Sequence, residues 1–173
     1  MRVLVAHDGG EAGDRALSAI ANWAGTSQAE VHLVTILNPG EAHDTSRGDL
    51  VHSMTPAATT TGQLLHSGEP LPTLAEDRSQ AVSWVLTETK EKLHDVASRL
   101  LPGIEVTVHA DINERVAEAI IELAETLQAE LIAAGTHGRT GISHVLMGSV
   151  AERLVRQSPV PVLVIGPKVG TSQ

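Results

Sequence analysis

ELIAAGTHGRTGISHVLMGSV, residues 130–150, joins two patterns that together predict an α/β fold. Residues 130–134 form a short apolar run of the kind found in a buried strand of a parallel sheet. Four glycines follow between residues 135 and 150, and a helical pattern runs from about residue 148 to the stop at Ser158-Pro159. A strand, a glycine-rich loop and a helix in succession form the repeating unit of parallel α/β sheets.

The same alternation of strands and helices runs along the whole chain. It predicts an open, Rossmann-like sheet of five parallel strands with helices on both faces. Right-handed crossovers and a doubly wound topology favour the strand order 3-2-1-4-5. The expected strands are Arg2–His7, Glu30–Leu37, 104–109, 130–134 and Val160–Ile165, and the expected helices are 11–24, about 73–100, 116–127 and 148–157. Asp111 and Glu114 have capping-box spacing and predict a helix start directly after them.

The length and composition suit one domain over residues 1–173, because a chain that is 42% hydrophobic can bury a core. Residues 39–72 break the alternation, since they hold half of the eight prolines and a run of three threonines. We expect a long polar excursion there that is partly mobile. It is either a tolerated or disordered insertion or a lid over a ligand.

Charge and composition argue against several classes of partner. The net charge is −9, and Trp23 and Trp84 are the only aromatic residues, so neither a polyanion nor single-stranded nucleic acid is an expected partner. The chain has no cysteine for disulfides or thiolate chemistry. Its first apolar run is shorter than the roughly 7–15 residues of a secretory signal, and no stretch reaches the ~20 residues of a membrane span. We therefore expect a cytoplasmic protein with no membrane contact.

The predicted topology places a ligand site at two segments of the chain. With the order 3-2-1-4-5, the direction of winding reverses between the first and fourth strands, and ligands bind beyond the carboxyl ends of the strands at such a point. Residues 6–9 and 135–138 arrive there. Gly135 and Gly138 either adopt a positive φ and admit a ligand to the backbone, or allow a tight turn and close helix–sheet packing. Asp8 either caps the first helix or accepts hydrogen bonds from an adenine amine or a ribose hydroxyl.

The predicted start of the last helix favours an anion. Free N–H groups and the positive end of the helix dipole lie at Gly148 and Ser149. The Ser149 hydroxyl either donates to a phosphate or caps the helix. Between residues 135 and 158 three arginines (139, 153 and 156) stand against Glu152, so the local charge is 3 − 1 = +2 in an acidic chain.

No motif for turnover accompanies this arrangement. The chain has no G-x-x-x-x-G-K-[ST] loop, no G-x-G-x-x-G after the first strand and no G-x-S-x-G elbow. His7, His137 and His144 lack the spacing of metal ligands, so we expect no catalytic residue and no metal site made by the chain. A site that holds a nucleotide is better supported than one that converts it.

These residues make the chain resemble the universal stress protein family. Nucleotide-binding members of that family carry G-x2-G-x9-G-[ST] after the fourth strand, and Gly135, Gly138, Gly148 and Ser149 match it completely. The opening VLVAHDGGE resembles the usual V-D-G-S-E with the aspartate at position 8, and VAERLVRQSPVPVLVIG resembles the usual ending. The resemblance covers residues 1–38 and 80–168. Gly10 departs from it by replacing a serine, as does Ala6, where some members have proline.

The resemblance implies an adenine nucleotide alpha hydrolase-like fold that binds ATP, AMP or ADP with Mg²⁺ or Mn²⁺ on the phosphates. Asp8 and the backbone near Ile36 would hold the adenosine, residues 134–138 would line the ribose and phosphate path, and residues 148–150 would take the phosphates. Members commonly form homodimers through the last strand, here Val160–Ile165. The full set of implied binding residues is Ala6, Asp8, Ile36, Ala134, Gly135, His137, Gly138, Arg139, Gly148, Ser149 and Val150.

Three functions fit these observations. The first is a stress-response or regulatory protein that binds an adenine nucleotide with little or no turnover. The second is a weak ATP hydrolase or an adenylyl-transfer enzyme. The third is a protein-interaction module in which the pocket is vestigial.

Overall fold

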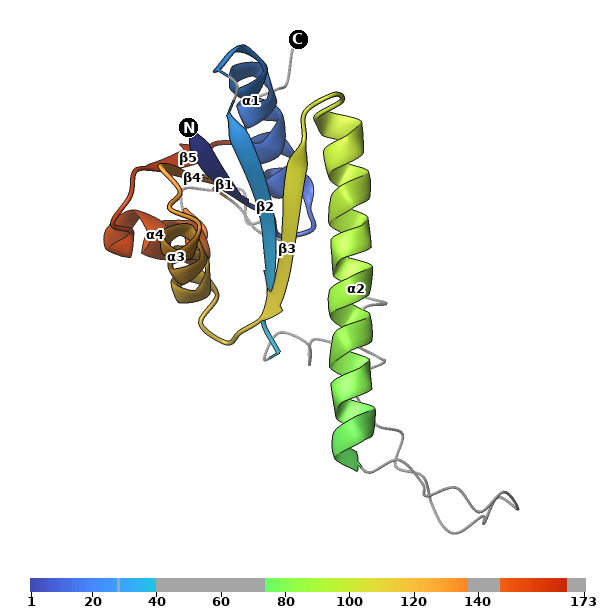
Figure 1. Cartoon of the computed structure of the whole chain (residues 1–173). Helices are drawn as coiled ribbons and strands as arrows, with labels where there is room; N and C mark the ends of the chain where they lie inside the picture. Colours follow the sequence, from blue (N-terminus) through green and yellow to red (C-terminus); the bar gives the residue numbers. More distant parts are fainter. Residues whose placement is uncertain (28, 40–73, 137–146, 168–173) are drawn as a thin grey trace, which may run out of the picture.

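In the computed structural model the chain forms a five-stranded sheet flanked by helices (Figure 1). The structure describes residues 1–27, 29–39, 74–136 and 147–167. The elements alternate as the sequence predicts: β1 (Arg2–Ala6), α1 (Glu11–Ser27), β2 (Glu30–Leu37), α2 (Leu74–Leu100), β3 (Val106–Ile112), α3 (Val116–Thr126), β4 (Leu131–Gly135), α4 (Ser149–Gln157) and β5 (Val162–Ile165).

The sheet has the order β3-β2-β1-β4-β5, which confirms the predicted topology. All four pairings are parallel. In the centre, Val5 of β1 lies in register with Leu33 of β2 on one side and Ala133 of β4 on the other. These strands are apolar runs because helices cover both of their faces.

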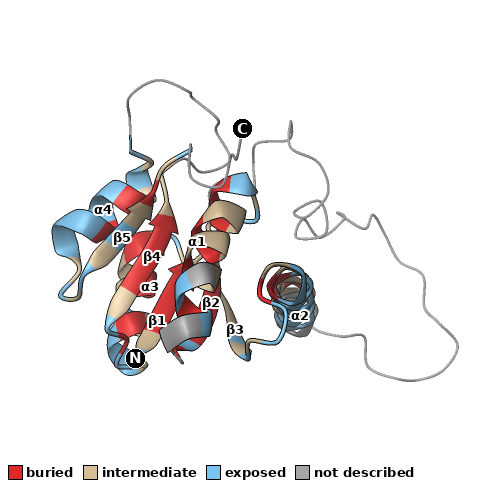
Figure 2. Ribbon diagram, turned by 90° about the horizontal axis from the view of Figure 1, so that it is seen from above, coloured by how far each residue is buried: buried red, intermediate tan, exposed pale blue. Residues whose placement is uncertain are grey.

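One face of the sheet is covered by α1 and α2. Leu17 and Ile20 of α1 and Leu93 of α2 are buried against Val3 and Val5 of the central strand. In Figure 2 the central strands are almost continuously buried, whereas exposed surface is concentrated on the outer sides of the helices. The odd-numbered residues of β1 therefore define the α1 side of the molecule.

The opposite face is covered by α3 and α4. Ile120 of α3 and Leu154 of α4 are buried against Leu4 and Ile132. The predicted inward stripe of α3 is confirmed, since its regularly spaced apolar residues are buried in this cluster or packed against it. Helices on both faces complete the predicted doubly wound architecture.

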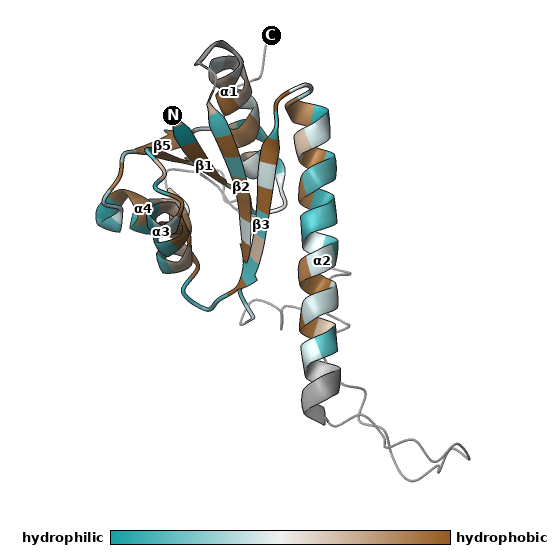
Figure 3. Cartoon of the chain, in the orientation of Figure 1, coloured by the Kyte–Doolittle hydropathy of each residue, from teal (hydrophilic) through white to brown (hydrophobic). Residues whose placement is uncertain are grey.

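The longest helix, α2, extends past the carboxyl ends of β2 and β3 (Figure 1). Its buried residues Val85, Leu93 and Ala97 share one face, since they are spaced by multiples of four. The rest of the helix carries a large hydrophilic surface (Figure 3), and Trp84 is 54% exposed. No described helix has the length and apolar character needed to span a membrane.

The local capping signal before α3 is wrong. β3 continues to Ile112 because Asp111 stays in register with Ile36 of β2, so pairing overrides the predicted turn. The Asp111 carboxylate accepts a hydrogen bond from the adjacent N–H of Ile112 at 2.8 Å. Asn113 instead accepts one from the N–H of Arg115 at 2.9 Å, just before the helix begins. Residues 40–73, which include nearly all of the expected excursion, lie outside the described residues.

Candidate functional site

The carboxyl ends of β1 and β4 lie side by side at the centre of the sheet, where Ala6 is in register with Ala134. This is the predicted point of reversal. Ala134 is buried in the cluster under α3 and α4, and Ala6, Ile36 and Val150 pack against that cluster. Four residues that the sequence assigned to one site, from four different elements, therefore share the same side of the sheet.

The loop after β1 is tied to the start of α1 by a carboxylate. Asp8 Oδ1 accepts hydrogen bonds from the N–H of Gly10 at 3.1 Å and of Gly13 at 3.2 Å. Gly9, between Asp8 and Gly10, adopts a φ of 81°, a left-handed conformation that favours glycine. Asp8 thus satisfies the first turn of α1, which is the capping role considered for it.

The start of α4 has a different construction. Gly148 is the N-cap residue, with φ −55° and ψ 147°, and no side-chain cap hydrogen bond is made there. Ser149 is the first residue inside the helix, so of the two alternatives for its hydroxyl the structure does not contain the capping one. The first helical bond runs from the N–H of Glu152 to the carbonyl of Gly148 at 2.9 Å. The amides of residues 149–151 therefore have no acceptor within the helix.

Backbone hydrogen bonds hold the two ends of the glycine-rich loop together. The N–H of Gly148 donates to the carbonyl of Thr136 at 2.5 Å, and the N–H of Thr136 donates to the carbonyl of Ile165 at 2.9 Å. Gly135 and the start of α4 are thereby brought to the same place. Of the predicted site residues, His137, Gly138 and Arg139 lie outside the described residues.

Gly135 is a glycine because of packing. A Cβ atom at this position would lie 2.5 Å from the carbonyl oxygen of Ala12 in α1, closer than real contacts allow. Its φ is not positive, so the predicted left-handed conformation is wrong at this residue. Close helix–sheet approach, the alternative reading of this glycine, is what the structure contains.

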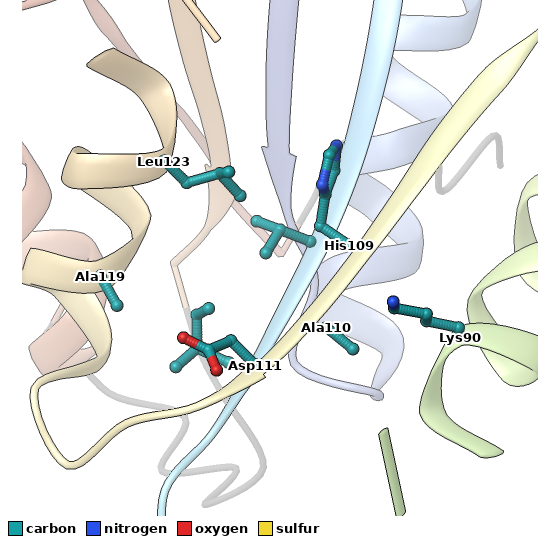
Figure 4. Close-up of a pocket in the computed structure, with 8 residues that line it drawn as sticks. Lys90, His109, Ala110, Asp111, Ala119 and Leu123 are labelled. Carbon is teal, nitrogen blue, oxygen red and sulfur yellow. The ribbon is translucent and has the colours of Figure 1, made fainter. Parts of the chain in front are cut away.

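A cavity of about 170 Å³ opens between β2, β3 and α3, and Lys90 of α2 also lines it (Figure 4). Ile36, a predicted contact of the adenosine, lines it together with His109 and Asp111 at the carboxyl end of β3. His109 and Asp111 are not among the predicted site residues, because the third strand was expected to end at residue 109 and Asp111 to cap a helix. The available signal was a continued strand whose polar residues share one face. The lining residues are Val34, Ile36, Lys90, His109, Ala110, Asp111, Ala119 and Leu123.

The surroundings of the imidazole in the cavity wall disfavour its protonated form. Burial lowers the pKa of His109, and the nearby positive charges of His32 and Lys90 lower this pKa further. His32 Nδ1 lies 3.0 Å from His109 Nε2, and His32 Nε2 lies 3.1 Å from Glu30 Oε1. The hydrogen bond from Arg2 is the main reason that the pKa of the Glu30 carboxyl lies below its usual value. The lining therefore combines apolar side chains and this imidazole with the charged groups of Lys90 and Asp111.

Comparison with known proteins identifies the family. The sequence model of the universal stress protein family matches residues 1–166. The chain therefore belongs to the universal stress protein family.

Two curated relatives are similar over part of their length. Universal stress protein MJ0531 of Methanocaldococcus jannaschii is 36% identical over 92 residues, which are 53% of this chain and 54% of that protein. Universal stress protein Mb2346c of Mycobacterium bovis is 28% identical over 136 residues, 77% of this chain and 46% of that protein. The chain thus spans about half the length of these curated relatives.

Solved structures share the fold, and two of them are nucleotide complexes. Hypothetical protein MJ0577 superposes with a TM-score of 0.69 at 21% identity, over 96% of both chains. A universal stress protein in complex with cAMP gives 0.53 at 19% identity, again over 96% of both chains. The universal stress protein of Archaeoglobus fulgidus in complex with dAMP gives 0.50 at 19% identity, over 95% of this chain and 97% of the other.

Proposed function

We propose that this protein binds an adenine nucleotide, as a stress-response or regulatory protein with little or no turnover. The observation that carries the proposal is the start of α4, which meets the carboxyl ends of β1 and β4 with amides that have no acceptor within the helix and no side-chain cap. Helix starts of this kind bind phosphate groups. The cAMP and dAMP complexes of relatives with the same fold support an adenine nucleotide as the ligand.

The charges in the site favour one orientation of the bound nucleotide. The Asp8 carboxylate at the start of α1 repels phosphates, whereas the start of α4 attracts them. We therefore place the phosphates on residues 148–150 and the ribose and base towards Asp8, Ile36 and the cavity beside His109. Ala6, Ala134 and Gly135 form the floor between the two ends. His137, Gly138 and Arg139 remain predicted contacts of the phosphate path.

A divalent ion would enter with the nucleotide. Within the described ranges no three His, Asp or Glu side chains are grouped closely enough to hold a metal ion. Mg²⁺ is commonly held by one or two carboxylates together with substrate phosphates and water. Mg²⁺ or Mn²⁺ on the phosphates of ATP is accordingly part of the proposal.

The polar side chains in the loop after β1 make hydrogen bonds within the chain. Asp8 accepts two backbone N–H groups, and the imidazole of His7 bonds to Asp14 and to the backbone. A general base must be able to reach and take a proton from the attacking group. This loop is better suited to holding a nucleotide than to activating water against it.

Native mass spectrometry of the purified protein tests the proposal, followed by thermal unfolding with ATP and Mg²⁺. We expect a bound mass matching ATP, ADP or AMP, and a gain of about 2.7 kcal/mol in unfolding free energy at 100 times the Kd. Absence of both, for all three nucleotides at millimolar concentration, would refute nucleotide binding. Sustained phosphate or pyrophosphate release that Gly148→Trp abolishes would instead establish the enzymatic alternative.

We also propose that residues 1–173 form one domain that pairs as a homodimer through β5. β5 is an edge strand, and its Leu163 is 43% exposed, so an apolar edge is open to a second copy. Sedimentation equilibrium should give twice the mass of the chain, and Leu163→Lys should shift the equilibrium towards the monomer. A wild-type monomer at micromolar concentration would refute this assembly.

A further inference from the structure

The residue before Asp8 has an unusual environment. His7 follows the last residue of β1, and its side chain is only 2% exposed under the first turn of α1. Its backbone is held from β2, because its N–H donates to the carbonyl of Val34 at 2.8 Å and its carbonyl accepts from the Thr35 hydroxyl at 2.7 Å. These hydrogen bonds fix the backbone of His7, and they therefore fix the direction in which its side chain extends from the sheet.

Both ring nitrogens of His7 are engaged by the protein. Nδ1 accepts a hydrogen bond from the N–H of Gly9 at 3.0 Å, and Nε2 lies 2.9 Å from Asp14 Oδ1 in α1. Because the Gly9 amide can only donate, Nδ1 must carry a lone pair, and in the neutral ring the proton is then on Nε2. The network selects one tautomer, in which Nε2 donates to Asp14.

The connection continues to α2. Arg99 Nη2 donates to the second oxygen of Asp14 at 2.9 Å. Asp14 is therefore held between the imidazole and the guanidinium, and its carboxylate cannot rotate away without breaking a hydrogen bond on each side. This orients the acceptor that fixes His7 Nε2.

α1 leaves a notch for this imidazole. A Cβ atom at Gly13 would lie 2.6 Å from His7 Cδ2 and 2.7 Å from Cγ, so any other residue at this position would collide with the ring. Glycine inside a helix is unfavourable relative to alanine. Its presence here is explained by the imidazole beneath it.

The His7 ring acts on the part of the loop that orients Asp8. Gly9 is in the left-handed region, at φ 81°, and its N–H points at His7 Nδ1. Fixing Gly9 fixes the path of the chain from Asp8 to Gly10, and the N–H groups of Gly10 and Gly13 then hold the Asp8 carboxylate. A loop held in one conformation before binding loses less free energy on binding than a loop that must first order.

We infer that His7 is a positioning residue of the nucleotide site. Through Nδ1 it holds the loop of Asp8, Gly9 and Gly10 in the binding conformation, and Asp14 and Arg99 hold the ring in the tautomer that this requires. The inference rests on the proposed function, because the loop matters for affinity only if the nucleoside end of the ligand meets it.

Two substitutions separate the nitrogens of the ring. In His7→Asn the side-chain oxygen can take the place of Nδ1 and accept from Gly9, whereas the contact to Asp14 is lost. In His7→Gln the side-chain amide can take the place of Nε2 and donate to Asp14, whereas the acceptor for Gly9 is lost. Each variant loses one hydrogen bond of the same ring, so each is the control for the other.

The measurement is the Kd of ATP with Mg²⁺ by isothermal titration, together with the Tm of each variant. If the loop occupies its binding conformation about one tenth of the time without Nδ1, His7→Gln weakens ATP by about tenfold while His7→Asn stays within about threefold of wild type. Equal affinities of wild type and His7→Gln overturn the inference but leave the proposed function intact. If the wild-type protein binds no adenine nucleotide, both the proposed function and the inference about His7 are refuted.

A second experiment does not depend on how the His7→Asn and His7→Gln variants fold. Long-range ¹H–¹⁵N correlation spectra of wild type report which nitrogen of His7 carries the proton, with and without ATP. A proton on Nε2 in both states is expected, and a proton on Nδ1 overturns the inference.

A third measurement uses Gly13→Ala, whose added Cβ would collide with the His7 ring. This substitution should weaken ATP binding when His7 is present but not in the His7→Ala background, where the ring is absent. An equal loss of affinity in both backgrounds would mean that Gly13 acts independently of the ring, and would overturn the inference.

Discussion

Two helices begin at the centre of this sheet, and their starts are built in opposite ways. α1 begins over a carboxylate of the chain itself, because Asp8 accepts the N–H groups of Gly10 and Gly13. α4 begins at Gly148 without a side-chain cap, and a backbone hydrogen bond from Gly148 to Thr136 joins it to the end of β4. A helix start attracts negative charge. Asp8 places such a charge at the start of α1. In the first turn of α4 the acidic residue Glu152 is paired with Arg156, and we propose that a ligand phosphate meets the start of this helix.

The comparison also accounts for the direction proposed for the nucleotide. A phosphate next to Asp8 would meet a like charge, while a ribose or an adenine amine would meet a hydrogen-bond acceptor. At the start of α4 a phosphate would meet backbone N–H donors and the positive end of the helix dipole, and is favoured there. Substitutions at the two helix starts, at their contact and in the neighbouring cavity test this difference.

Gly148→Asp gives α4 the kind of start that α1 has, and it has the largest expected effect. Aspartate is a favourable N-cap residue, so unfolding free energy should rise by a few tenths of a kcal/mol relative to glycine. The new charge occupies the anion site, and the affinity for ATP should fall by about 100-fold, from repulsion of a few kcal/mol at about 4 Å.

The matched control is Gly148→Asn, which caps the helix without a charge. Its effect on ATP affinity should be much smaller than that of Gly148→Asp. Titration calorimetry and thermal unfolding of both variants check this. If the two variants lose ATP equally, the electrostatic account of the α4 start is wrong.

Gly135→Ala tests the contact between the two regions, where β4 meets α1. The added Cβ would lie 2.5 Å from the Ala12 carbonyl oxygen, and forcing α1 away should reduce the unfolding free energy by about 1–3 kcal/mol. The control is Gly25→Ala within α1, where nothing lies within 4 Å of the added Cβ, and it should raise stability by up to about 1 kcal/mol. Denaturant unfolding measures both, and a Gly135→Ala protein as stable as wild type would refute the packing explanation.

Asp8→Ala removes the carboxylate from the start of α1. Loss of an N-terminal cap should lower the unfolding free energy by about 0.5–2 kcal/mol. Asp8→Asn keeps an acceptor oxygen for the amides of Gly10 and Gly13, so its stability should stay closer to wild type. Affinities for adenosine and ATP, measured with both variants, should fall together in Asp8→Ala. A rise in ATP affinity in Asp8→Ala, with the affinity for adenosine unchanged, would place the phosphates beside Asp8 and reverse the proposed direction.

His109→Gln has the smallest expected effect and probes the cavity beside the nucleoside end. Since the folded state lowers the pKa of His109, the unfolded chain binds a proton more readily, and stability falls as the pH drops through the ordinary histidine range near 6.5. His109→Gln should lose less stability than wild type between pH 7 and pH 5. The difference should be below about 1 kcal/mol, because the group is half-buried and partly screened. If wild type and His109→Gln lose stability equally between pH 7 and pH 5, the lowered pKa of His109 is not the cause of the loss.

Most of the fold could be predicted from the sequence. The apolar run Glu30–Leu37 was placed with its correct bounds, and the strand order followed from the alternation of elements and the rules of parallel sheets. These signals are local or follow from chain connectivity. β3 was placed too early because pairing with β2 extends it to Ile112, and the continued strand pattern there competes with the capping-box spacing of Asp111 and Glu114.

The meeting of the candidate segments could be predicted, but the contacts among their side chains could not. The motif residues Gly135 and Gly148 do come together, yet the first is a glycine because Ala12 packs against it. The role of His7 depends on Asp14, one turn into α1, and on Arg99, which is 85 positions further along the chain. Contacts of this kind depend on how α1 and α2 cover the sheet, and spacing along the sequence does not contain that information.

The central claim is that the start of α4 holds the phosphates while the β1 loop and β2 hold the nucleoside. A ¹H–¹⁵N amide titration of the labelled protein tests it directly. ATP with Mg²⁺ should shift the amides of Ser149, Val150, Gly9 and Ile36 saturably, and adenosine should shift only the last two. Saturable shifts confined to other residues, or no shift at Ser149 and Val150 with saturating ATP, would contradict it.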